Sequence, residues 1–158
     1  TGLGFEFDAA ISCTRLNHDD RIFSPKNIQI DDDYKFINYS VTNQDGIPSS
    51  ICRKWYRDSD NKGNHYFATK EDLKLLYSAN DIFADATFAP VAGFKKLFPE
   101  LYILSVRREL GDKKIIAVPC VFVLTTSKKE QNYKLIFNTI KKLVRSDLSD
   151  GDLSKCAF

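Results

Sequence analysis

The sequence contains no methionine, only two histidines and one tryptophan, and no apolar run near the roughly 18 residues that a membrane-spanning helix requires. Its four cysteines, Cys13, Cys52, Cys120 and Cys156, lie far apart and form no Cys-x-x-Cys pair. With so few imidazoles and no paired thiols, no zinc-site spacing can be assembled. We therefore expect no membrane partner, no zinc site, and reduced, half-buried cysteines in an intracellular protein.

The rest of the composition suits a folded domain. The 158 residues are 43% apolar and 13% aromatic, which is enough for a substantial core in one domain, with or without part of a neighbour. The chain begins at Thr1, has no methionine and ends on the apolar stretch Cys156–Phe158. These ends predict a piece of a longer protein.

Positive charge is concentrated in the second half of the chain. The range Pro90–Arg145 holds 12 Lys or Arg against four Asp or Glu, a balance of +8, whereas residues 1–89 hold 10 against 14, a balance of −4. This asymmetry favours a polyanionic partner such as DNA, although a solvated basic face gives the same pattern. The candidate DNA contacts are pairs of adjacent cations: Lys95, Lys96, Arg107, Arg108, Lys128, Lys129, Lys141 and Lys142.

Residues 1–50 show little organisation, and we treat them as an N-terminal region of unknown role. Strand-like patterns occur at Gly4–Ile11 and Tyr34–Val41. The turn-rich stretch Gln44–Ser50 predicts a linker. Basic and aromatic residues then alternate in Ile51–Arg57, which predicts a half-exposed strand; stacking on nucleotide bases is the alternative.

Asp85 is the most informative residue of the second part, 51–158. Thr69 and Asp72 have the spacing of a capping box, which predicts a helix to about Tyr77. The apolar strand Ile82–Phe88 follows, with Asp85 in its middle. A buried carboxylate is costly unless a cation, a donor network or a metal pairs with it. We therefore expect Asp85 on a buried central strand, with its carboxylate near the open end of the sheet.

Two strands and a helix are expected after Asp85. Leu101–Val106 and Ile115–Thr125 predict a hairpin, in which Pro119 marks an edge strand or a bulge. Ser127 and Glu130 have capping-box spacing, which predicts a helix from Lys128 to about Val144. Its apolar stripe, expected to be buried against the sheet, is Tyr133, Ile136, Phe137, Ile140, Leu143 and Val144.

This order of elements, a strand with Asp, two more strands and a helix, is similar to the opening of a ribonuclease-H-like domain. The sequence also resembles the MULE-type (Mutator-like) transposase domain over roughly residues 66–145. The matching residues, in order, are Phe67-Ala68-Thr69, Leu73, Leu75, Leu76, Asp85-Ala86-Thr87-Phe88, Phe94, Val118 to Leu124, and Lys129-Glu130 with Tyr133. The family usually has Asp-Gly-Thr-Phe where this chain has alanine at position 86.

The resemblance implies a catalytic set of three acids, of which only Asp85 has a counterpart here. Together such acids would hold two Mg²⁺ or Mn²⁺ ions that assist DNA cleavage. Asp147, Asp150 and Asp152 follow the last helix in a polar turn without a preceding strand, so we do not expect them to be catalytic. The end of the chain resembles the beginning of a fourth strand, cut before the second acid.

The predicted fold is α/β, with a ribonuclease-H-like mixed sheet that is incomplete at the C-terminus: a three-strand antiparallel meander followed by a packed helix. The predicted function is the N-terminal part of a DDE-type DNA transposase catalytic domain. Its full-length parent would use Mg²⁺ or Mn²⁺, with Asp85 as catalytic residue and metal ligand, whereas this piece would bind no metal tightly and be inactive. The resemblance implies DNA as partner and an intracellular, in eukaryotes nuclear, location, and leaves open a homo-oligomeric parent.

Two other interpretations stay open. The chain could belong to a domesticated, transposase-derived DNA-binding or scaffold protein that kept the fold and lost the chemistry. It could also come from a decayed element without a selected function. A second and a third acid downstream of Phe158 would favour the enzyme.

Overall fold

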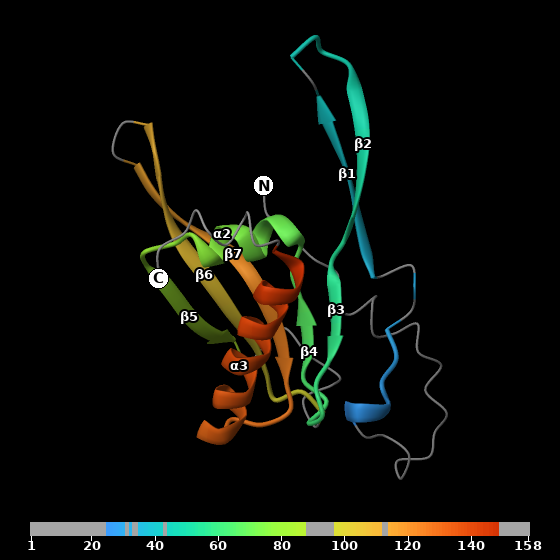
Figure 1. Ribbon diagram of the computed structural model, residues 1–158, viewed down its shortest axis with the longest axis vertical. Helices are drawn as coiled ribbons and strands as arrows, with labels where there is room; N and C mark the ends of the chain where they lie inside the picture. The colour runs from blue at the N-terminus through green and yellow to red at the C-terminus, as the bar shows by residue number, and fades with distance from the viewer. Residues whose placement is uncertain are drawn as a thin grey trace.

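The computed structural model describes residues 25–30, 32, 35–42, 44–87, 97–111 and 114–148. Within these ranges the chain is a mixed α/β protein with two α-helices and two antiparallel sheets, and neither sheet closes into a barrel (Figure 1). No helix in these ranges is long and apolar enough to cross a membrane. The strand expected at Gly4–Ile11 lies outside the described residues, as do Lys95, Lys96, Asp150 and Asp152.

The larger sheet has five strands. Along the chain they are β3 (Tyr56–Ser59), β4 (His65–Phe67), β5 (Ile82–Thr87), β6 (Glu100–Leu110) and β7 (Lys114–Thr125). Across the sheet their order is β3-β4-β7-β6-β5, and every neighbouring pair is antiparallel. The middle of the sheet is therefore β7, and β3 and β5 are its edges. The parallel pairing of a mixed sheet is not present among the described strands.

Strands β5, β6 and β7 form the antiparallel meander that the sequence predicts. The register of β6 and β7 shifts in the middle, since Leu104 lies opposite Val121 whereas Ser105 lies opposite Pro119. Cys120 is thus an extra residue on β7. The bulge expected near Pro119 is confirmed, whereas the alternative of an edge strand is wrong, because β7 has a neighbour on both sides.

Both helices lie on the same face of the five-stranded sheet (Figure 1). The first, α2 (Lys70–Tyr77), begins with the capping box that the sequence predicts. The Thr69 hydroxyl accepts a hydrogen bond from the Asp72 backbone N–H at 3.2 Å, and the Asp72 carboxylate accepts one from the Thr69 backbone N–H at 2.9 Å. Leu73 and Leu76 on this helix are buried.

The second helix, α3 (Glu130–Asp147), starts two residues later than expected and without a side-chain cap. The Ser127 hydroxyl accepts a hydrogen bond from the Lys129 backbone N–H at 3.3 Å, in front of the helix. Glu130 occupies the first helical position rather than the third, and its carboxylate pairs with Lys134 at 2.6 Å. The capping box predicted for Ser127 and Glu130 is therefore wrong.

Helix α3 packs on the sheet through part of its apolar stripe. Ile136, Ile140 and Val144 are buried in the first core, between the helices and the sheet. Phe137 is 40% exposed, so the prediction that it is buried is wrong. Its ring contacts Tyr102 edge-on, with centroids 6.2 Å apart. Among the described strands β5 is the last on this side, which leaves part of the Phe137 ring exposed.

A second core covers part of the opposite face. Trp55 stacks on Phe122 with ring centroids 5.6 Å apart, and Ile30 from the N-terminal segment is buried beside them. The short 3₁₀ turn η1 (Pro25–Asn27) approaches the sheet at Gly63, which has a φ of +82°. A Cβ atom on this residue would lie 2.7 Å from the Lys26 backbone nitrogen, so the contact requires glycine.

The smaller sheet is a two-stranded ribbon of β1 (Phe36–Thr42) and β2 (Pro48–Lys54) that extends away from the larger sheet (Figure 1). The single strand predicted at Ile51–Arg57 is broken at Trp55, whose backbone N–H donates to the Lys35 carbonyl at 2.8 Å. These residues are divided between β2 and β3. The expected linker Gln44–Ser50 forms the turn of the ribbon and the beginning of β2.

Candidate functional site

Asp85 lies on an edge strand and not at the centre of the sheet. β5 pairs with β6 alone among the described strands, and Ile82 to Asp85 are all exposed. The Asp85 carboxylate accepts a hydrogen bond from the backbone N–H of its neighbour Ala86 at 2.8 Å. The prediction of a buried central strand is therefore wrong, because an apolar run does not tell a central strand from an edge strand that lacks its outer neighbour.

The register of β5 and β6 shows on which face of the sheet the Asp85 side chain lies. Residues directly opposite in an antiparallel pair have side chains on the same face. Asp85 is opposite Ile103, which packs against the second core, whereas Ala84 is opposite Leu104, which belongs to the first core under the helices. Asp85 therefore lies on the face away from α2 and α3.

The described residues do not fit a pair of divalent cations. Mg²⁺ and Mn²⁺ require several oxygen ligands, and two ions require carboxylates that bridge them. Across the described part of the chain, no three His, Cys, Asp or Glu side chains lie close enough together to hold a metal ion. Asp85 supplies one exposed carboxylate, and no reaction step through a metal can be built on it alone.

An apolar groove runs between β5 and the two helices, on the face opposite Asp85. Its floor and walls are mostly apolar, with two cations on the α3 side. The lining residues are Leu76, Tyr77, Ile82, Leu104, Phe137, Ile140, Lys141, Val144 and Arg145. Ile82 is 45% exposed at this edge. The groove ends where α3 ends, so the C-terminal turn of α3 lies beside the beginning of β5.

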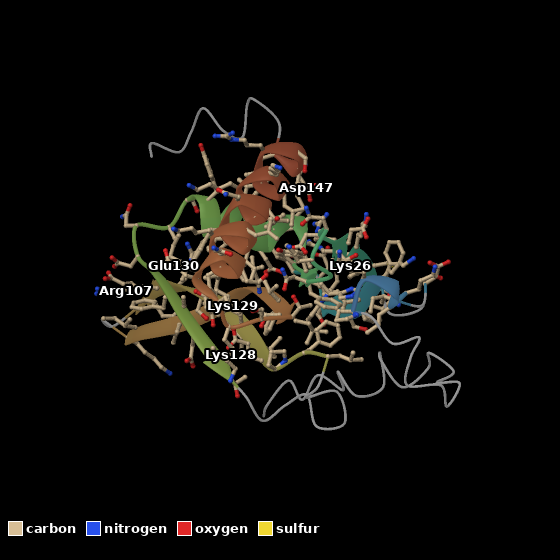
Figure 2. All side chains as sticks on the ribbon, turned by 90° about the horizontal axis from the view of Figure 1, so that it is seen from below. Lys26, Arg107, Lys128, Lys129, Glu130 and Asp147 are labelled. Carbon is tan, nitrogen blue, oxygen red and sulfur yellow. The ribbon has the colours of Figure 1, made fainter. Side chains whose placement is uncertain are left out.

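The candidate DNA contacts that the structure describes lie in three places. Lys128 and Lys129 precede α3, Lys141 and Lys142 lie near its end, and all four are exposed. Because an α-helix rises about 1.5 Å per residue, these two pairs are roughly 20 Å apart. Figure 2 shows Lys129 near the beginning of α3 and Asp147 at its far end.

The third place is β6, where Arg107 and Arg108 are exposed. Arg107 pairs with Glu109 at 3.0 Å and lies 3.7 Å from Asp81, so part of its charge is offset. Figure 2 shows Arg107 on the opposite side of the molecule from Lys26. The candidate DNA contacts among the described residues therefore lie near the two ends of α3 and on β6, and they do not form one compact patch.

Glu100 is a buried acid that the sequence does not reveal. It lies at the beginning of β6, is 1% exposed, and accepts a hydrogen bond from the Tyr133 hydroxyl at 2.6 Å. Burial, together with this bond, raises the pKa of Tyr133 to about 12. Glu100 faces α3, on the opposite side of the sheet from Asp85, so these two carboxylates do not converge on one site.

His65 is the second buried polar residue that the sequence does not single out. Its Nδ1 lies 2.9 Å from the Tyr56 hydroxyl, and its Nε2 lies 3.1 Å from the Pro25 carbonyl oxygen. Nε2–H donating to the carbonyl leaves Nδ1 to accept from the hydroxyl, which fits the neutral ring. Burial lowers the pKa of His65 and raises that of Tyr56 to about 12. This contact attaches the N-terminal segment to the sheet.

Asp147 has a structural partner. Its carboxylate pairs with Arg57 of β3 at 2.5 Å, and the Arg57 Nε–H also donates to the Ala68 carbonyl at 2.6 Å. The ion pair connects the end of α3 to the edge of the sheet. Asp147 is the last residue of α3, so the prediction that it follows the helix in a polar turn is wrong.

The cysteines in the described part differ in exposure. Cys120 is buried, and burial raises the pKa of its thiol to about 12, whereas Cys52 is exposed on β2. Both are free thiols.

Searches of this chain against protein-family models, curated proteins and solved structures find no match.

Proposed function

We propose that this chain is the N-terminal part of a DNA transposase catalytic domain with a ribonuclease-H-like sheet. The full-length parent would cleave and transfer DNA strands with Mg²⁺ or Mn²⁺, and the chain itself would bind duplex DNA without cutting it. The observation that carries the proposal is the meander of β5, β6 and β7, with Asp85 on its first strand and α3 packed on the sheet directly after it. This is the order that the sequence resemblance implies.

The free edge of β5 supports the same proposal. β5 and β7 both run antiparallel to β6, so they run parallel to each other. A strand that follows the crossover helix α3 would run parallel to β7, and hence to β5. The end of α3 lies beside Ile82, where β5 begins. A further strand with a second acid could therefore join β5 on its free side, next to Asp85.

The exposure of Asp85 favours a second candidate, a DNA-binding or scaffold protein without catalysis. The carboxylate is exposed and accepts a hydrogen bond from the Ala86 backbone N–H, so the fold has no need of a metal to offset its charge. Both candidates predict binding to DNA. They differ in whether Asp85 has any part in chemistry.

A titration of labelled duplex at two salt concentrations, with Mg²⁺ or Mn²⁺ present, tests the proposal. We expect weak binding without sequence preference and no nicks in the DNA strands. Lys141→Glu with Lys142→Glu should lower the affinity and reduce the salt slope by about 2, since each phosphate contact contributes about 0.9. The matched control, Lys62→Glu with Lys70→Glu in the acidic half, should leave the slope unchanged.

Three results would count against this picture. Absence of binding at low salt would mean that the cations only form a solvated face. Nicking that Asp85→Asn abolishes and Asp45→Asn preserves would show that the chain is an active enzyme, so that the expected inactivity is wrong. Nicking that survives Asp85→Asn would remove Asp85 from the site.

A further inference from the structure

The joined ends of β6 and β7 form an arm that extends beyond the rest of the larger sheet (Figure 1). β5 pairs with β6 only as far as Val106, and β4 pairs with β7 only from Phe122 to Leu124. Residues 107–110 and 114–117 therefore pair only with each other among the described strands, and all of them except Ile116 are exposed. We call these residues the β6–β7 arm.

One face of the arm has its charges met within the chain. Side chains that are opposite each other in the register share a face. This face carries Arg107, Glu109, Ile115 and Ala117. Arg107 pairs with Glu109 at 3.0 Å and lies 3.7 Å from Asp81. Little charge on this face is therefore left for a partner.

The other face, which we call the basic arm face, carries Arg108, Leu110, Lys114 and Ile116. Arg108 and Lys114 are exposed and have no ion pair within the described part of the chain. Leu110, directly opposite Lys114 at the tip, is 48% exposed. The turn between the strands, 112–113, adds one charge of each sign. The basic arm face therefore combines two uncompensated positive charges with an exposed apolar side chain.

A hollow of about 510 Å³ lies beside the base of the arm, where the arm approaches the end of α2. Asn80, after the end of α2, and Arg108, from the arm, line it. Its two acids, Asp81 and Glu109, are those that lie beside Arg107. The hollow can therefore receive an anionic group without exposing it to an unpaired carboxylate.

The dimensions of the arm fit the major groove of B-form DNA. A strand rises about 3.3 Å per residue, so Leu110, three residues beyond Arg107, lies roughly 10 Å further out. The major groove is about 12 Å wide and 8.5 Å deep, and it admits a two-stranded β-ribbon. The major groove of duplex RNA is narrow and deep, so it does not admit such an arm.

A lipid surface is the other kind of partner that a basic arm with an apolar tip suits. Ile115 is 55% exposed, but it lies directly opposite Glu109. Entry of the tip into lipid would take the Glu109 carboxylate and its partner out of water, which is costly. In a DNA groove that face stays in water, so the arm fits DNA better than lipid.

We propose that the β6–β7 arm enters the major groove of B-form duplex DNA with its basic arm face toward the DNA. Arg108 and Lys114, on different strands of the arm, contact phosphates on the two sides of the groove. The hollow beside Arg108 receives one backbone, and Leu110 covers sugar and base edges between the phosphates. The inference rests on the proposed binding of DNA, and it adds the element, the face and the groove.

Titration of labelled duplex DNA over a range of salt concentrations, with the full 158-residue chain, tests the role of the basic arm face. Arg108→Gln with Lys114→Gln should reduce the salt slope by about 1.8, because each lost phosphate contact removes about 0.9. The matched control, Lys62→Gln with Lys70→Gln, removes the same charge away from the arm and should leave the slope unchanged.

A second control addresses the opposite face of the arm. Arg107→Gln with Glu109→Gln removes an ion pair and no net charge, so the salt slope should stay that of the unmodified chain. Emission from Trp55 and circular dichroism establish that each variant is folded.

The choice of groove is tested on the unmodified chain. Dimethyl sulfate methylates guanine N7 in the major groove and adenine N3 in the minor groove. The bound chain should protect guanine N7 and leave adenine N3 reactive. Duplex RNA of the same sequence should bind more weakly than DNA at equal salt, because the arm cannot enter its major groove.

The outcomes distinguish this inference from the proposed function. Absence of DNA binding at low salt would overturn both. A full salt slope in the variant of Arg108 and Lys114, protection of adenine N3 alone, or equal affinity for the two duplexes would overturn the inference and leave the proposed function standing. Binding to phosphatidylserine vesicles that this variant loses, with DNA binding unchanged, would assign the arm to a membrane and overturn it as well.

Discussion

At the scale of single residues, buried polar side chains hold separate parts of this fold together. Asn64 is completely buried in the turn before β4. Its Oδ1 accepts from the Thr126 backbone N–H at 2.9 Å, and its Nδ2 donates to Asn132 Oδ1 at 2.9 Å and to Asp60 Oδ2 at 2.8 Å. Among the described residues, no buried side-chain nitrogen or oxygen lacks a partner. One amide thus connects a turn, the end of β7 and helix α3.

The pair of Tyr133 and Glu100 gives a prediction at this scale. Tyr133→Phe removes the only side-chain donor bonded to Glu100 in the described structure and leaves a buried carboxylate without it. We expect the free energy of unfolding to fall by about 1–3 kcal/mol, the usual cost of an unsatisfied buried acceptor. Urea denaturation measures the change.

A double-mutant cycle separates this bond from the loss of the hydroxyl itself. In a Glu100→Gln background the same Tyr133→Phe change should cost clearly less, because an amide is easier to leave unpaired than a carboxylate. Equal costs in the two backgrounds would show that the hydrogen bond contributes little.

His65 predicts how stability depends on pH. Burial lowers its pKa in the folded state, so the unfolded chain takes up a proton first as pH falls. The folded state keeps its full stability above the ordinary histidine pKa of about 6.5 and loses stability as pH falls below it. Urea midpoints between pH 8 and pH 5.5 measure the loss. His65→Gln should abolish most of it.

These residues explain why part of the candidate site was not predictable. Whether an acid, an amide or an imidazole is buried depends on strands far away in the sequence. Glu100 looks like a surface residue after Pro99, and Asn64 like part of a polar turn. Asp85 was singled out for a burial that does not occur, because its strand has no outer neighbour among the described ones. No local pattern carries this information.

At the scale of elements, the same short-range signal was reliable for one helix and not for the other. The capping box of α2 is a contact between Thr69 and Asp72, three positions apart, and it formed as predicted. The similar spacing of Ser127 and Glu130 formed no box, because Asn132 donates to the Ser127 carbonyl at 2.8 Å in the tertiary network and α3 begins later.

On helix α3, we predict that truncating Ile136 lowers the free energy of unfolding more than truncating the larger Phe137. Ile136 is completely buried, so Ile136→Ala should lower the free energy of unfolding by about 2–5 kcal/mol. Phe137 is 40% exposed beside the groove, so Phe137→Ala should cost about 1 kcal/mol, closer to a surface change. Chemical denaturation of the two variants compares them directly. The reverse order would mean that the Phe137 ring is covered in solution.

At the scale of the whole molecule, the meander was predictable and the assembly around it was not. β5, β6 and β7 follow one another in sequence, and the pairing of β6 with β7 follows from the hairpin pattern. On its other side β7 pairs with β4, and β3 follows at the edge. Paired residues of β4 and β7 are nearly 60 positions apart in the sequence, as His65 and Leu124 are. No local sequence pattern predicts such a long-range pairing. The ribbon was missed for a related reason, because the strand is interrupted at Trp55, whose N–H bonds to the carbonyl of Lys35, 20 residues earlier.

The central position of β7 has a consequence for how the protein emerges from the ribosome. The strands on either side of β7 are β4 and β6, and both are synthesised before it. Each therefore has one unpaired edge until residues 114–125 leave the exit tunnel. Until then the pairs β3–β4 and β5–β6 lack the strand that joins them, and two-stranded pairs are only marginally stable in water. We therefore expect the cooperative step of folding to be the insertion of β7 between β4 and β6. Ribosomal pausing or chaperone binding should influence the yield most within this window, after β6 has emerged and before β7 has.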